Sequence, residues 1–461
     1  MIPQWELRAA FARSLSEMYG REVPAYTTLL RVSAEVNADV MAKDGERAQR
    51  LGRMDRVTAE RHGAIRVGTR AELRDVGQVF VAFGMHPVGF YDLRDASASS
   101  VPVVSTAFRP READELARNP FRVFTSLLVT EDRRFFDADL QQRLEAFLGR
   151  RRLFPPRVLE LAARSEANGG LEPADADELV RGATACFALS KEPIDRAWYE
   201  ELSRVSAVAA DIGGVSSTHI NHLTPRVLDI DELYRRMSDL GIEMIDEIQG
   251  PPAWEGPDVL LRQTSFRALA EPRGFTDGAG TLRVRFGEVE ARGIALTAAG
   301  RSRYDQLLTD VDRRVVTSGR SRVAPAGRLR EAVAAEVWRE GMPRTEEELD
   351  RAGLGAFTYR SSAGRGRPSG SVHDLVAAGH AVREPIVYED FLPRSAAGIF
   401  QSNLTEAGSR DDAAAGAHRD ASWLAGALGR DVTDPIVQCA EQTSASLRAL
   451  ATELNLTEIP K

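Results

Sequence analysis

The chain has 461 residues, 43% of them hydrophobic and 28% charged, so it can bury a core over two or three domains and is not mainly disordered. Its net charge of −8 gives no electrostatic reason to expect nucleic acid or an anionic membrane as a partner. The two cysteines, Cys186 and Cys439, exclude a disulfide framework and favour a reducing cytoplasm, and no apolar run approaches the about 18 residues of a membrane span.

The first half of the chain is predicted to hold one strand–helix–strand–strand–strand unit between helical segments. Apolar residues at helical spacing indicate helices over roughly the first 60 residues and again over 138–205. Between these segments, an amphipathic helix is expected at 70–83. Apolar, β-branched runs predict strands at 62–67, 89–93, 101–108 and 121–130.

The same order of elements returns further along the chain. It begins with a strand-like stretch at 219–223 and a helix at 230–240. Strands are then predicted at 243–248, 259–269 and 281–290. Helical spacing dominates after residue 297. The sequence therefore predicts two related units, although no sequence repeat is visible.

Histidine is scarce, with seven in the chain, so each one is informative. His62 opens a predicted strand, and His219 and His222 are three residues apart in another, where they should point to opposite faces. We therefore expect one of them at a site and the other in a structural role. Glu288 and Glu290 share a strand face, so alternation cannot choose between them. Two imidazoles and one carboxylate form the facial triad of non-heme iron(II) oxygenases.

Arg66 lies four residues after His62 on the same predicted strand, so both side chains can point into one cavity. A guanidinium there suits a carboxylate, and an ordinary salt bridge on the strand face is the equal alternative. Gln263, Thr264 and Ser265 could orient substrate oxygens or simply satisfy buried neighbours. The chain has no GxxxxGK[ST], GxGxxG, HExxH or GxSxG motif, which argues against phosphate-loop, dinucleotide, zincin and serine-hydrolase sites.

Six segments in order resemble the 2-oxoadipate dioxygenase/decarboxylase family, over about residues 25–405. They are RHGAIRVGTR, VFVAFGMHPVGFYDL, HINHLTPRVLDID, LLRQTSFRALAE, FGEVEARGIALTAAGR and SAAGIFQSN. The resemblance implies an α+β fold with a core similar to the vicinal oxygen chelate fold, in which two βαβββ modules form a mixed sheet around a metal site, with extra helices. The predicted order of elements agrees with it independently.

The division of the chain that follows has five segments. They are an N-terminal helical segment at 1–58, a first βαβββ-like module at 59–135, a helical insertion at 136–205, a second module at 206–300, and an extension of helices and strands at 301–461 that completes the pocket.

The resemblance also implies an activity and a set of site residues. Members of the family are iron(II) enzymes that convert 2-oxoadipate and dioxygen to 2-hydroxyglutarate and carbon dioxide in lysine breakdown. The implied metal ligands are His62, His222 and Glu290. Arg66 would hold the distal carboxylate of the substrate, and Arg394 and Ser395 would line the same pocket.

One residue departs from the family pattern, which usually has valine where this chain has Arg394. An added cation could tighten the binding of a dicarboxylate or indicate a different substrate, and neither follows if its side chain points to solvent. The alternatives to the implied reaction are another 2-oxo acid, isomerase or hydrolase chemistry with another metal on the same scaffold, and a non-catalytic metal-binding protein.

Overall fold

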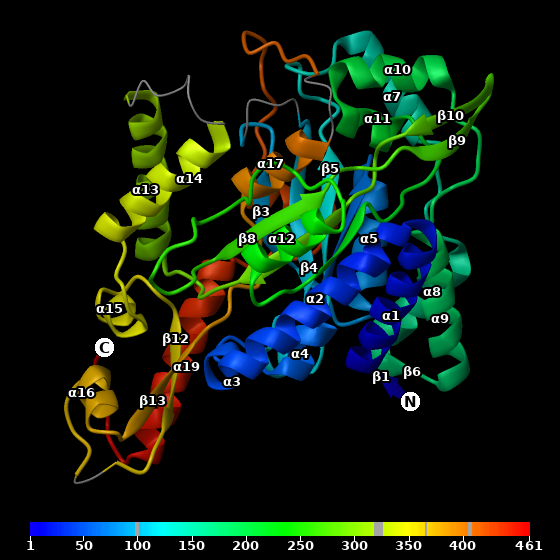
Figure 1. Cartoon of the computed structure of the whole chain (residues 1–461). Coiled ribbons are helices and arrows are strands. Elements are labelled where there is room, and N and C mark those ends of the chain that lie inside the picture. The colour runs from blue at the N-terminus through cyan, green and yellow to red at the C-terminus, as the bar shows by residue number, and fades with distance from the viewer. Residues whose placement is uncertain (97–100, 318–325, 365–366, 404–407) are drawn as a thin grey trace.

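The computed structural model describes residues 1–96, 101–317, 326–364, 367–403 and 408–461. A five-stranded mixed sheet lies at its centre, where Figure 1 labels β3, β4 and β5. The order of its strands is β3-β4-β5-β2-β7. Strands β2 and β5 are parallel, and the other neighbours are antiparallel. The strands are β2 (Arg61–Val67), β3 (His86–Asp92), β4 (Val103–Arg109), β5 (Arg122–Leu128) and β7 (His222–Pro225). The predicted α+β class with a mixed sheet is confirmed.

The first module has the predicted order of elements. Helix α5 (Arg70–Val81) connects β2 to β3, and the short helix α6 (Ala113–Arg118) connects β4 to β5. A capping box starts α5: the Glu72 N–H donates to Thr69 Oγ1, and the Glu72 carboxylate accepts from the Thr69 N–H. These bonds satisfy N–H groups that a helix start leaves free. The cap thus fixes where β2 ends and α5 begins.

Side-chain alternation along the strands separates two buried faces of this sheet. One face carries apolar residues such as Ile65, Val67 and Val123, which belong to the main hydrophobic core. The helices that contribute to this core include α1 (Gln4–Glu22), α2 (Pro24–Lys43), α8 (Pro156–Asn168) and α9 (Pro173–Cys186). The opposite face carries His62 and Arg66, which are both buried. The buried polar side chains of β2 therefore lie on the face of the sheet opposite the main hydrophobic core.

The second module is less regular than predicted. Its helix α12 (Ile230–Asp239) is present, and β8 (Leu261–Phe266) pairs antiparallel with β11 (Gly287–Arg292). The predicted strand at 243–248 forms only single bridges to β8, from Met244 and from Gln249 just beyond it.

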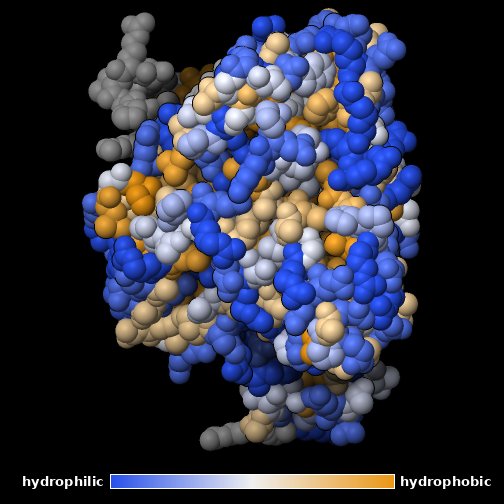
Figure 2. Space-filling model, turned by 90° about the vertical axis from the view of Figure 1, so that its right-hand side faces the viewer, coloured by the Kyte–Doolittle hydropathy of each residue, from blue (hydrophilic) through white to orange (hydrophobic). Residues whose placement is uncertain are grey.

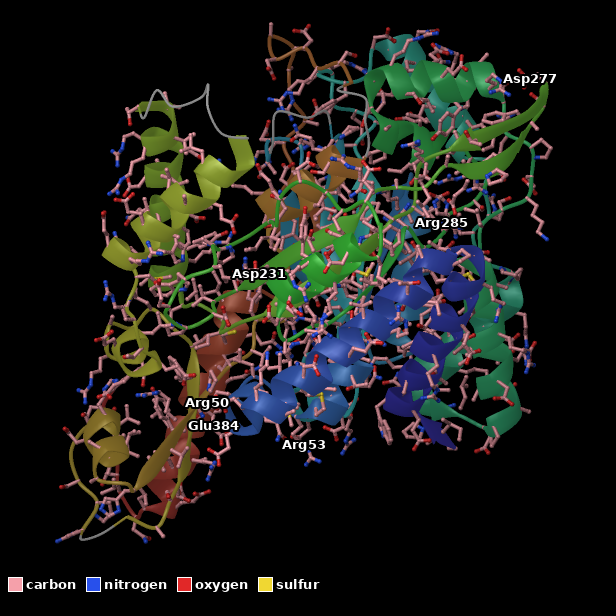
Figure 3. All side chains as sticks on the ribbon, in the orientation of Figure 1. Arg50, Arg53, Asp231, Asp277, Arg285 and Glu384 are labelled. Atoms are coloured by element: carbon pink, nitrogen blue, oxygen red, sulfur yellow. The ribbon has the colours of Figure 1, made fainter. Side chains whose placement is uncertain are left out.

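A hairpin of β9 (Glu271–Phe275) and β10 (Gly278–Leu282) lies between β8 and β11, so the long strand predicted at 281–290 was wrong. The hairpin turns at Thr276 and Asp277, and Gly278, which opens β10, has a φ of 142° that side chains rarely allow. Arg285, which follows β10, is buried and pairs with Glu22 and with Glu271 at 2.6 Å; it is labelled in Figure 3. These ion pairs hold Arg285 in a buried position between β10 and β11, within the stretch that was predicted as one strand.

Strand β11 lies against β7 and so joins the second module to the sheet. Arg226 and Glu290 form a parallel bridge, and the Val227 N–H donates to the Glu290 carbonyl at 2.8 Å. Since β7 is itself paired with β2, three strands from distant parts of the chain meet here.

The remaining elements surround this centre (Figure 1). The helices are α3 (Gly45–Ala48), α4 (Met54–Ala59), α7 (Ala138–Leu148), α10 (Arg196–Val205), α11 (Ala207–Gly213), α13 (Ala298–Thr317), α14 (Ala326–Gly341), α15 (Glu346–Arg351), α16 (Val372–Ala377), α17 (Pro393–Asn403), α18 (Ala421–Leu428) and α19 (Pro435–Glu453), and the strands are β1 (Ile2–Pro3), β6 (Gly170–Leu171), β12 (Phe357–Ser361) and β13 (Ala381–Pro385). Figure 2 shows a mostly hydrophilic face with apolar residues in small groups. In the described part of the chain, no helix has both the length and the apolar character to cross a membrane.

Candidate metal centre

The meeting of β2, β7 and β11 brings together side chains that the sequence places far apart. His222 lies directly across from Ala64 in the antiparallel β2–β7 pair, and Ala64 lies between His62 and Arg66 on one strand face. The imidazole of His222 is therefore flanked by those two side chains. Glu288 and Glu290 reach the same place from β11.

One carboxylate and two imidazoles have the spacing of a metal-binding set. Ligand atoms of His62, His222 and Glu288 all lie within 4.8 Å of one another, and all three residues are buried. The Glu288 carboxylate is 3.3 Å from His62 Nε2 and 3.5 Å from His222 Nε2. Burial raises the pKa of Glu288, although His62 and the Gln263 amide oppose that rise. No arginine or lysine in the described residues pairs with this carboxylate, whose partners are the two imidazoles and the Gln263 amide.

Glu290 approaches the other nitrogen of the same ring, with its carboxylate 3.0 Å from His62 Nδ1. It also accepts two hydrogen bonds from Arg292, at 2.6 and 2.9 Å, and lies 3.4 Å from Arg122. Burial would raise the pKa of Glu290, but the charges of Arg292, His62 and Arg122 outweigh it and lower the pKa to about 2. Glu290 is thus a permanent carboxylate that the protein already neutralises.

The two imidazoles differ in their surroundings. Burial lowers the pKa of His222, and the charges of His62 and Arg66 lower it further, so this ring stays neutral as a metal ligand must. Its Nδ1 is 2.9 Å from Thr224 Oγ1, which orients the ring and leaves Nε2 toward Glu288. Burial also opposes a charge on His62, but Glu290 and Glu288 outweigh it and raise the pKa of His62.

These residues fit a bound metal ion. Both ring nitrogens of His62 are buried and make no hydrogen bond of good geometry within the described residues, although a carboxylate lies near each. A buried nitrogen without a partner is costly, and a metal ion is one partner that removes this cost. Two imidazoles and a carboxylate are the donors that suit iron, manganese and zinc.

A buried network of ion pairs adjoins this centre through Glu290. Its acidic members are Glu60, Glu290 and Glu389, and its basic members are Arg56, Arg122, Arg226 and Arg292. Glu60 accepts from Arg122 at 2.7 Å and from Arg226 at 2.9 Å. Removing one partner of such a network leaves an unpaired buried charge, so its members fix the position of Glu290 and, through it, of His62.

Arg66 lies on the same face beyond His222. Its Nη1 pairs with Asp211, whereas its buried Nη2 has no hydrogen-bond partner in the described residues. The guanidinium carbon is 4.9 Å from the centre of the Phe400 ring, within reach of a cation–π contact. His219 Nε2 lies 3.3 Å from Asp211, so the first histidine of HINH belongs with this acid and not with the metal-binding set.

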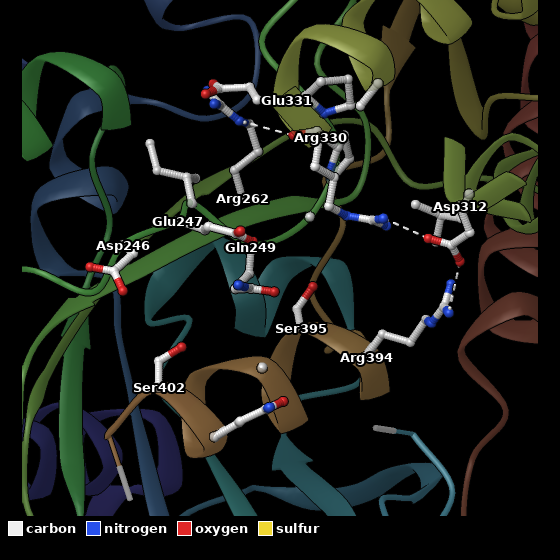
Figure 4. A pocket seen from close by; sticks show the side chains of 18 of the residues that line it. Asp246, Glu247, Gln249, Arg262, Asp312, Arg330, Glu331, Arg394, Ser395 and Ser402 are labelled. Carbon is white, nitrogen blue, oxygen red and sulfur yellow. Dashed lines mark hydrogen bonds and ion pairs between the residues drawn. The ribbon is translucent and has the colours of Figure 1, made fainter. Parts of the chain in front are cut away.

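Arg394 and Ser395 line a pocket whose lining includes neither His62 nor Arg66. They begin α17, and Gln249 and Arg262 line the same pocket, which has a volume of about 790 Å³ (Figure 4). The Arg394 side chain is 59% exposed and lies 3.2 Å from Asp312. Because it points to the surface, the expectation that it tightens a dicarboxylate or changes the substrate does not follow. Ser395 is buried.

Other polar and aromatic contacts complete the surroundings. The Gln263 amide donates to Glu288, which is a structural partner rather than a substrate atom. The Phe391 ring lies edge-on to His62, with ring centres 4.9 Å apart. Sequence reasoning missed Asp211 and Phe391, because neither belongs to a recognisable ligand spacing; Asp211 lies outside the predicted strands, and Phe391 ends a strand-like stretch, 382–391, that carried no sign of a site.

Comparison with known proteins agrees with this architecture. The family model of 2-oxoadipate dioxygenase/decarboxylase matches residues 11–403. A 2-oxoadipate dioxygenase/decarboxylase of Mycobacterium tuberculosis is 56% identical over 435 residues, which cover 93% of this chain and 94% of that protein. The protein of the same name from Pseudomonas putida is 41% identical, covering 98% and 97%.

A crystal structure of hydroxyglutarate synthase in complex with 2-oxoadipate, also from Pseudomonas putida, covers 99% of both chains with a TM-score of 0.86 and 39% identity. Both the sequence and the whole fold are therefore shared with these proteins. The chain belongs to the 2-oxoadipate dioxygenase/decarboxylase family.

Proposed function

We propose that this protein is an iron(II)-dependent dioxygenase that decarboxylates 2-oxoadipate, yielding 2-hydroxyglutarate and carbon dioxide, a step of lysine breakdown. Family membership over nearly the whole chain supports the reaction. The convergence of two buried imidazoles and a buried carboxylate, together with two His62 nitrogens that make no hydrogen bond in the described residues, supports the metal. This convergence is the observation that carries the proposal.

His62 and His222 are the proposed histidine ligands, and β11 supplies the carboxylate. The family resemblance implies Glu290, held in place by Arg292 and Arg122. The geometry favours Glu288 as the alternative, because it lies within reach of both Nε2 atoms and has no cation of its own. With Glu288 as the ligand, Glu290 would orient His62 by accepting a hydrogen bond from Nδ1.

Iron(II), when bound, supplies open coordination positions for the 2-oxo acid and for dioxygen. The protein's own residues position the substrate and exclude water. Arg66 is placed to bind the distal carboxylate through its free Nη2, since a charge-assisted hydrogen bond satisfies both groups. Phe391 and Phe400 cover His62 and Arg66 with apolar rings, which strengthens the electrostatic interactions beneath them.

Oxygen consumption tests the proposed reaction. Protein loaded anaerobically with iron(II) is expected to consume dioxygen when 2-oxoadipate is added and to release one carbon dioxide per dioxygen, with 2-hydroxyglutarate as product. Protein loaded with zinc is the control and should consume none. Substrate turnover without oxygen uptake would indicate an isomerase or hydrolase instead, and uptake with a different 2-oxo acid would leave the metal centre and change the substrate.

Replacing Arg66 with lysine is expected to raise KM for 2-oxoadipate about 100-fold, or about 2.7 kcal/mol, while kcat changes much less. A lysine can pair with Asp211 or with the substrate, but it cannot present two separate donors in the geometry of a guanidinium. Steady-state oxygen uptake measures this effect. Arg70→Lys, which alters an exposed arginine paired with Glu131, is the matched control. An unchanged KM in Arg66→Lys would remove Arg66 from substrate binding.

A further inference from the structure

Asp211 lies at the centre of a buried polar cluster that contains none of the proposed metal ligands. It lies within α11, is only 4% exposed, and pairs with Nη1 of Arg66. The amide of Asn221 donates to the same carboxylate oxygen at 2.9 Å, and His219 lies 3.3 Å from the other oxygen. Two side chains from one further segment, Asn221 and His219, thus hold this carboxylate beside Arg66.

The cluster fixes the direction of the arginine as well as its charge. Nη1 pairs with Asp211, and the guanidinium carbon lies over the Phe400 ring, 4.9 Å from its centre. Rotation of the guanidinium is therefore restricted. Its buried Nη2 remains without a partner, which is costly unless a ligand supplies an acceptor. The Arg66 main chain is fixed as well, because Thr218 Oγ1 donates to its carbonyl at 2.7 Å.

We propose that Asp211 is a positioning residue that makes the site selective for 2-oxo acids with a second carboxylate. It acts through Arg66, whose Nη2 it keeps directed toward the substrate, and Asn221 and His219 keep Asp211 in place. The inference rests on the proposed function, in which Arg66 binds the distal carboxylate. It goes further by assigning a role to Asp211 and to His219, the first histidine of HINH.

The negative charge of Asp211 also has an effect that opposes selectivity, because it partly neutralises Arg66, but this effect is the weaker of the two. Removing its negative charge would leave Arg66 more positive toward a dicarboxylate, but it would also leave a buried cation without its counter-charge, held by at most one carboxamide oxygen and therefore less firmly directed. A buried guanidinium without its acceptor turns toward any other acceptor within reach, so the loss of direction outweighs the gain in charge. The proposal therefore requires selectivity to fall, not rise, when Asp211 is neutralised.

The test compares 2-oxoadipate with 2-oxohexanoate, which has the same chain length and a methyl group in place of the distal carboxylate. In Asp211→Asn the ratio of kcat/KM for the two acids is expected to fall at least tenfold, through KM for 2-oxoadipate. Iron affinity, measured by equilibrium dialysis, should stay within twofold of wild type. In an Arg66→Lys background, Asp211→Asn should change the ratio little, because it acts only through Arg66.

Asp132→Asn is the matched control, since Asp132 is also fully buried and paired with two arginines, Arg94 and Arg134. It should leave the ratio unchanged. Asn221→Ala keeps every charge and removes one donor to Asp211, so it should lower the ratio about threefold even if Asp211→Asn does not fold. An unchanged or increased ratio in either cluster variant would overturn the inference.

The wild-type protein separates this inference from the proposed function. No activity toward either acid would overturn the proposed function and the inference with it. Equal activity toward 2-oxoadipate and 2-oxohexanoate would overturn the proposed role of Arg66 in binding the distal carboxylate. The inference about Asp211 would then fail as well. A wild type that prefers 2-oxoadipate, together with an Asp211→Asn variant that does so equally, would overturn the role of Asp211 alone.

Discussion

Alanine in place of His62 or His222 is expected to abolish metal binding, with bound iron falling from about one ion per chain to less than about a tenth of that. Each variant removes one of the two proposed imidazole ligands, and the remaining imidazole and carboxylate would hold a divalent ion far more weakly. Metal analysis after reconstitution and desalting measures the loss. Oxygen uptake with 2-oxoadipate should be lost in parallel.

His219→Gln is the control for these two variants. His219 is buried beside Asp211 and is three residues from His222 in the same segment, yet its ring does not belong to the proposed ligand set. This variant should keep its full complement of iron. Metal loss in His219→Gln, or retention in His222→Ala, would show that the wrong histidine of HINH was assigned to the metal.

Glutamine substitutions at Glu288 and Glu290 are expected to have sharply different effects. The variant that removes the ligand should lose iron at least 100-fold in affinity, about 2.7 kcal/mol. The variant that removes the orienting carboxylate should lose about tenfold, the lower range for a group behind a ligand. Both residues lie on one strand face and differ little in burial, so each serves as the matched control for the other.

The two outcomes have different structural meanings. A larger loss in Glu290→Gln would make the ligand the carboxylate that Arg292 and Arg122 already hold, as the family resemblance implies. A larger loss in Glu288→Gln would make the ligand the carboxylate that lacks a cation, with Glu290 supporting His62. Equal retention of iron in both variants would remove β11 from the metal site.

The sequence predicted the first module well because its strands are long, apolar and separated by clear turns. The capping residues Thr69 and Glu72 mark the start of α5 within one residue of the expected position. The second module was harder, because ion pairs of Arg285 and the β9–β10 hairpin replace regular pairing there. Side-chain alternation says nothing of such tertiary contacts, so the predicted strand boundaries failed at this point.

In the candidate site, too, local patterns predicted some features correctly, whereas features that depend on tertiary contacts were not predicted. His62 and Arg66 were placed on one face by strand alternation, and the structure has them on one face. The reason given for separating His219 from His222 did not hold, since residues 219–221 precede β7 and do not alternate as a strand. The exposed position of Arg394 depends on Asp312 of α13, which no local pattern could indicate.

The pairing of β7 with β2 has a thermodynamic consequence for the whole molecule. Positions 62 and 222 come from different modules, and the carboxylate comes from a third strand, so an ion bound among them closes loops of more than sixty residues. Any ion that binds only the folded chain stabilises it, by about 2.7 kcal/mol at a free concentration 100 times its dissociation constant. The supply of metal in the cell would then govern not only how fast the protein works but also how long each molecule lasts before it unfolds.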